Sequence, residues 1–158
     1  LFNKNDLNEI SFFKKLGIEP LSKKFNENYF KNYIKNKNKN IKNLLMDQTF
    51  VSGLGNIYVN EVLFMSKIYP MTISRKLRTT KIKILILNIK KILKDSISKG
   101  GSSIKDFISS RGKTGTFQQF FKVYGKENKN CSRNSCGGNI KKIFVSNRST
   151  FYCNKCQS

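Results

Sequence analysis

The four cysteines of this chain constrain its fold more than any other feature. They form a C-x4-C pair and a C-x2-C pair near the C-terminus, namely Cys131, Cys136, Cys153 and Cys156. Thiolate pairs at such spacings are typical of a zinc ribbon, in which two knuckles flank a β-hairpin. The segment is too short to bury a core of its own, so a metal has to hold it together. We predict one structural Zn²⁺ with four protein ligands.

Two other uses of these cysteines are open. Two disulfides would suit an oxidising compartment, but the chain shows no secretion signal. An iron–sulfur cluster is possible, although the usual spacing is missing. Within the zinc ribbon we predict a turn at Gly137 and Gly138, strands over 140–145 and 149–152, and a tip formed by residues 146–148.

A second motif is the stretch VSGLGNIYVNE at residues 51–61. Gly53 and Gly55 predict a tight turn, because glycine tolerates positive φ and close backbone approach. Asn56 then precedes an apolar run that is typical of a helix, and asparagine is a favoured N-cap residue. The first amides of such a helix attract anions. We therefore predict an anion site at a helix start capped by Asn56.

The charge of the chain indicates what the anion is. Lysine and arginine number 31 against 9 acidic residues, which gives a formal net charge of +22. This excess favours a nucleic-acid partner over a merely solvated basic face. The chain contains no histidine, so histidine-based catalysis or zinc ligation is excluded. No apolar run is long enough for a membrane span, and we expect a cytoplasmic protein.

Hydrophobic periodicity predicts helices over residues 22–35, 41–48 and 79–99. Their apolar stripes are expected to form the core. The loop at 36–42 carries Lys37 and Lys42, and its composition fits either a solvated connector or a phosphate contact. The glycine-punctuated loop at 109–116 fits either a ligand-covering loop or an inert connector.

Together these pieces resemble the C-terminal half of the bacterial formamidopyrimidine-DNA glycosylases. The resemblance rests on the strings LGIEPLS, IKNLLMDQ, VSGLGNIYVNE, GGSSIKDF, GKTGTFQ, VYGK and RSTFYCNKCQ, which cover almost the whole chain. It implies a mainly α fold, with a helix-two-turn-helix bundle followed by a small β-hairpin zinc ribbon. The implied divisions are a linker from an N-terminal catalytic domain at 1–20, the DNA-binding domain at 21–121, and the zinc finger at 122–158.

The resemblance also assigns roles to residues. Lys37, Lys42, Gly55, Asn56 and Arg148 would bind DNA, and Arg148 would in addition serve catalysis as the proton donor for δ-elimination. A loop of five residues would cover an everted oxidised purine; it consists of Arg111, Gly112, Lys113, Thr114 and Gly115. The implied partner is double-stranded DNA with oxidised purines or abasic sites, bound by a monomer in the bacterial nucleoid.

Two departures from the family pattern stand out. The first cysteine pair of the family is normally C-x2-C, so the turn between Cys131 and Cys136 must differ. The family's nucleophile is an N-terminal proline amine followed by a catalytic glutamate, and neither is in this sequence. We therefore expect the N-terminal half to be missing and this chain alone to bind DNA without glycosylase or lyase chemistry.

Two other functions are compatible with the sequence. The endonuclease VIII branch favours oxidised pyrimidines, whereas NIY after the glycines, GKTGTFQ and RSTFYC favour the purine branch. A non-catalytic zinc-ribbon protein that binds RNA or the ribosome would fit the charge. In that case the glycine turn and the Arg148 hairpin would be coincidental.

Overall fold

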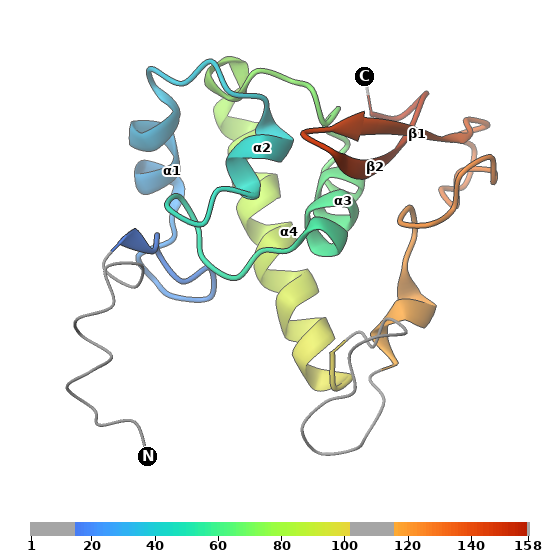
Figure 1. Ribbon diagram of the computed structural model, residues 1–158, viewed down its shortest axis with the longest axis horizontal. Helices are drawn as coiled ribbons and strands as arrows, with labels where there is room; N and C mark the ends of the chain where they lie inside the picture. Colours follow the sequence, from blue (N-terminus) through green and yellow to red (C-terminus); the bar gives the residue numbers. More distant parts are fainter. Residues whose placement is uncertain (1–14, 102–115, 158) are drawn as a thin grey trace.

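A computed structural model describes residues 15–101 and 116–157. Its described part contains four α-helices and one two-stranded antiparallel sheet. The helices are α1 (Glu27–Ile34), α2 (Ile41–Leu45), α3 (Asn56–Met65) and α4 (Thr79–Ser98), with short 3₁₀ turns at Ser74–Lys76 and Phe117–Phe120. The strands are β1 (Ile140–Val145) and β2 (Arg148–Cys153). Figure 1 shows the hairpin beside α2 and α3, with α4 behind them. None of the helices in these residues has the length and hydropathy of a membrane span.

The predicted helices are present but shorter. The stretch 22–35 is helical only over α1, because Asn26 caps it and accepts a hydrogen bond from the Tyr29 amide. In the same way Asn40 caps α2, which ends at Leu45 instead of residue 48. The long helix α4 begins at Thr79 as predicted and ends one residue early, where Gly100 and Gly101 take positive φ.

The core lies between α1, α3 and α4. Phe25 and Phe30 from the first predicted stripe are fully buried, and Phe30 meets Phe50 edge-on at 5.1 Å between ring centroids. Most of the predicted α4 stripe is buried as well. Leu93 is only partly buried, and Ile97 is 67% exposed near the end of the helix.

The segment expected to be a linker is tied to the turn before α3. The Gly17 amide donates to the Gln48 carbonyl at 2.7 Å, and Ile18 pairs with Val51 in a short parallel bridge. Glycine is required at position 17 because a Cβ there would lie 2.4 Å from the Phe50 carbonyl group. This contact holds the turn against the remainder of the fold.

The hairpin differs from the prediction at its tip. Val145 pairs directly with Arg148, so the turn consists of two residues, Ser146 and Asn147, both at positive φ. That geometry suits a type I′ turn, which matches the twist of the flanking strands. Arg148 therefore begins β2 and is not part of the tip. A second, smaller cluster of buried side chains, including Val123, Ile140 and Phe151, lies under this hairpin.

Candidate nucleic-acid interface and metal centre

The four cysteines come together as the sequence predicts. Their sulfur atoms all lie within 4.8 Å of one another. The Sγ–Sγ distance is 3.9 Å between Cys131 and Cys156, and 3.6 Å between Cys136 and Cys153. A tetrahedral zinc with Zn–S bonds of about 2.3 Å needs sulfur atoms roughly 3.8 Å apart. The residues therefore fit the metal, and the wider C-x4-C turn is accommodated by a positive φ at Ser135.

The outer edge of β2 is docked on α2 and α3 through polar side chains. The Ser149 carbonyl accepts hydrogen bonds from Lys42 Nζ at 3.2 Å and from Asn56 Nδ2 at 3.1 Å. One residue pair further along, the Phe151 amide donates to Asn60 Oδ1 at 2.6 Å. Without these partners, the N–H and C=O groups at this edge of β2 would be left to solvent. These bonds make the hairpin and the start of α3 one unit.

Asn56 is not the N-cap residue that the sequence predicts. The N-cap position of α3 is Gly55, and no side chain caps this helix. Asn56 is instead the first helical residue, and its side chain is used on the hairpin. Within the described residues, the amides of Asn56 and Ile57 donate to no acceptor. The helix start therefore keeps unsatisfied donors, which is what an anion site requires.

The two glycines of the turn also differ from each other. Gly53 has φ +79°, whereas Gly55 has φ −98° and ψ 168°, an extended conformation open to any residue. A Cβ at Gly55 would meet nothing within 4 Å. Folding of this chain therefore does not require glycine at position 55.

A prediction follows for Gly55. Gly55→Ala should change the free energy of unfolding by less than about 1 kcal/mol, the ordinary range for an N-cap exchange. If a phosphate binds the amides of Asn56 and Ile57, the same change should weaken binding to duplex DNA severalfold, because a methyl group next to these amides would hinder the phosphate. Gly53→Ala is the control, since a side chain at positive φ mainly costs stability, about 1 kcal/mol. Wild-type affinity of the Gly55 variant would contradict this account.

Lys42 is buried, in contrast to the exposed position that a simple phosphate contact suggests. Its side chain is fully inaccessible, and Nζ also donates to Thr150 Oγ1 at 2.5 Å. Burial, together with the positive charge of Arg148, lowers the pKa of Lys42 from 10.5 to about 8. The periodicity of a short helix gives no signal for this, because the cover comes from a strand more than a hundred residues later in the chain.

The lowered pKa of Lys42 predicts how the stability of the fold depends on pH. Between pH 8 and 10.5 the unfolded chain holds more protons on Lys42 than the folded chain, so stability contributed at this site should rise with pH. The free energy of unfolding of wild type relative to Lys42→Met, measured by denaturant titration, should increase over that range. Lys37→Met is the matched control, because Lys37 is exposed. A constant difference between wild type and Lys42→Met would refute the prediction.

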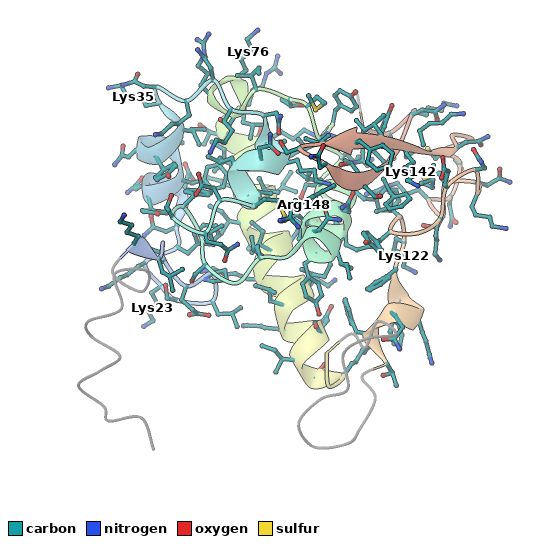
Figure 2. The ribbon with its side chains drawn as sticks, viewed as in Figure 1. Lys23, Lys35, Lys76, Lys122, Lys142 and Arg148 are labelled. Atoms are coloured by element: carbon teal, nitrogen blue, oxygen red, sulfur yellow. The ribbon has the colours of Figure 1, made fainter. Side chains whose placement is uncertain are left out.

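Arg148 is exposed at the start of β2, and Figure 2 shows it in front of α3. Its charge acts on Lys42, so the two cations are neighbours. Its guanidinium has no hydrogen-bond or ion-pair partner among residues 15–101 and 116–157. Lys37 lies on the loop before α2, with its ammonium 5.2 Å from the centroid of the Tyr33 ring. The five loop residues predicted to cover a base, 111–115, lie outside the described residues.

Two polar residues of α3 were not singled out from the sequence. Asn60 and Glu61 are buried in the apolar run of the helix. The carboxylate of Glu61 accepts hydrogen bonds from the backbone amides of Lys122, Val123 and Tyr124 at 2.8–2.9 Å. The sequence does contain an indication of their importance, because two polar residues in succession interrupt an otherwise apolar helix. Glu61 attaches the segment that leads into the metal centre, and Asn60 attaches β2.

Known proteins are similar in sequence to this chain. A model of the formamidopyrimidine-DNA glycosylase H2TH domain matches residues 16–108, more than half of the chain. The chain belongs to this family. The Histophilus somni formamidopyrimidine-DNA glycosylase is 40% identical over 153 residues, which cover 97% of this chain and 56% of that protein. The Roseobacter denitrificans enzyme is 44% identical over 142 residues, covering 90% and 50%.

Solved structures of the family have the same fold. A Lactococcus lactis Fpg mutant in complex with a Fapy-dG-containing DNA superimposes with a TM-score of 0.89 at 39% identity, over 99% of this chain and 57% of that one. The Lactococcus lactis Fpg in complex with DNA containing an abasic site gives a TM-score of 0.88 at 40% identity, over 99% and 57%. This member of the family thus spans about half the length of the relatives that it matches.

Proposed function

We propose that this chain is the DNA-binding part of a base-excision-repair DNA glycosylase and AP lyase that removes oxidised purines and nicks the strand by β,δ-elimination. The observation that carries the proposal is the joint of the hairpin with α2 and α3. It puts the exposed Arg148 and the open helix start at Gly55 and Asn56 on one rigid unit. The family membership and the lesion-bearing DNA in the Lactococcus lactis structures support the same reading.

The helix start and Arg148 supply complementary kinds of phosphate contact. Backbone amides at a helix N-terminus bind one anion through hydrogen bonds and the helix dipole. A guanidinium binds a second phosphate with two parallel hydrogen bonds. Lys37 would add a point charge on the adjacent loop. Because these groups contact phosphate, they fix the position of the duplex without reading its sequence.

Four thiolates fit one structural Zn²⁺, which would supply a fixed frame for β2 and no chemistry on DNA. The resemblance to the family assigns the attack on C1′ of the damaged nucleotide to an N-terminal proline amine, and we propose no such role for a residue of this chain. We propose that residues 21–121 and 122–158 grip the duplex as a monomer in the bacterial cytoplasm, with residues 111–115 over an everted base.

Oxidised purines are favoured over oxidised pyrimidines because the relatives described above are formamidopyrimidine-DNA glycosylases. The chain alone should bind an abasic duplex and leave it uncut. Chemistry by the chain alone would refute the division of tasks.

Binding should depend strongly on salt. With about four to six phosphate contacts, the slope of log affinity against log salt should be roughly −4 to −5. Fluorescence anisotropy with an abasic duplex at several salt concentrations measures it. Lys37→Ala should make the slope shallower by about one, whereas Lys23→Ala, an exposed lysine beside α1, should leave it unchanged. Salt-independent binding, or tighter binding to RNA than to lesion-bearing duplex, would refute the proposed function.

A further inference from the structure

The C-terminal end of α3 is closed by side chains from two different parts of the fold. Carbonyl groups at a helix end lack intrahelical partners, and cationic side chains satisfy them well. Lys81 of α4 donates to the carbonyls of Ser66 and Lys67. Arg133 donates to the carbonyls of Phe64 and Met65, at 2.5 and 3.2 Å. One of these caps belongs to the helical part and the other to the metal centre.

Arg133 comes from the turn between the first two cysteines. It lies two residues after Cys131 and three before Cys136, in the wider C-x4-C turn. Its guanidinium also stacks on the Phe64 ring, with 4.6 Å between Cζ and the ring centroid. A planar guanidinium can bond two carbonyls and stack at the same time, which an ammonium cannot do.

A second link from the metal centre reaches the same region. Gln157 follows Cys156 directly and is almost fully buried. Its amide nitrogen donates to the Ile68 carbonyl at 2.9 Å, while its oxygen accepts from the Cys153 amide at 2.8 Å. Both knuckles of the metal centre therefore contact the chain at the end of α3, through residues that lie within two positions of a cysteine.

We propose that Arg133 is a positioning residue that couples metal loading to the C-terminal end of α3. With the metal bound, the Cys131–Cys136 turn is fixed and the guanidinium closes the helix. Without it, the turn is released and the end of α3 frays. Because the other end of α3 carries the open amides beside Arg148, the coupling reaches the phosphate-binding face. Only this last step rests on the proposed function.

The experiment is hydrogen exchange of the amides at residues 64–68, with zinc bound and after chelation. In wild type, chelation should lower their protection about tenfold. In zinc-loaded Arg133→Ala, protection should already be low, and chelation should change it less than twofold. Arg133→Lys keeps the charge and should recover part of the protection. DNA affinity is measured separately, and zinc-loaded Arg133→Ala should bind the abasic duplex severalfold more weakly.

Two matched variants separate coupling from general damage. Lys81→Ala removes a cap from the same helix end but not from the metal centre, so chelation should still lower protection tenfold. Lys155→Ala removes a cation from the C-terminal knuckle without a contact to α3, and should behave as wild type. Wild-type protection in zinc-loaded Arg133→Ala would overturn the proposal. Loss of zinc from both Arg133 variants would also overturn it, because Arg133 would then act on the metal site itself. If zinc-loaded Arg133→Ala loses protection but binds the abasic duplex as wild type does, the coupling ends at α3 and does not reach the phosphate-binding face. Failure of wild type to bind the duplex would instead refute the proposed function.

Discussion

Cys153→Ser is expected to release the metal and to weaken binding to an abasic duplex by at least about 100-fold, while the helical part stays folded. Cys153 is fully buried at the end of β2, the strand that begins with Arg148. A two-stranded hairpin has little stability of its own in water. Without the metal, Arg148 loses its fixed position, and a loss of two or more phosphate contacts accounts for the size of the effect.

The helical part should survive because its core is separate. The larger cluster of buried side chains is built from residues 25–121 and contains none of the cysteines. Metal analysis, far-ultraviolet circular dichroism and anisotropy measure the three quantities. Ser132→Ala is the control, since Ser132 is exposed, lies between Cys131 and Cys136, and is not a metal ligand. Metal-free protein with full DNA affinity, or a collapse of the helical signal, would contradict the prediction.

Local patterns in the sequence predicted the elements well. Cysteine spacing was sufficient to predict the cluster of four thiols, because the ligands of each pair are neighbours in the chain. Apolar periodicity was sufficient for α4, whose buried face includes Ile82, Leu85 and Ile89. The predicted turn at Gly53 is confirmed by its positive φ. In each case the residues that carry the pattern lie within a few positions of one another in the sequence.

The details of the site could not be predicted in the same way. Asn56 looks like an N-cap residue by its type, yet Gly55 is the N-cap. The side-chain amide of Asn56 instead donates to the Ser149 carbonyl. Lys42 looks like a surface cation, yet the hairpin covers it. Both outcomes depend on contacts about a hundred residues apart, for which a single sequence carries no periodic signal.

Arg148→Lys in the complete protein is expected to retain part of the base excision and to lose more of the δ-elimination. A guanidinium is a poor acid, so a literal proton transfer from Arg148 is the less physical role. Binding the 3′ phosphate as it leaves, and stabilising its charge, needs a planar donor in a fixed place. Lysine keeps the charge but not the planar pair of donors. The comparison therefore isolates geometry from charge.

The measurement is the ratio of β to δ products on an abasic duplex under single-turnover conditions. Arg148→Lys should raise that ratio about tenfold, and Arg148→Ala should raise it further. Lys141→Ala is the matched control, since Lys141 is an exposed cation on the same hairpin that lies away from the start of α3. An unchanged ratio in both Arg148 variants would remove Arg148 from the elimination step. Its exposed guanidinium would then serve only to hold the duplex, and the δ step would need a donor from the other half of the enzyme.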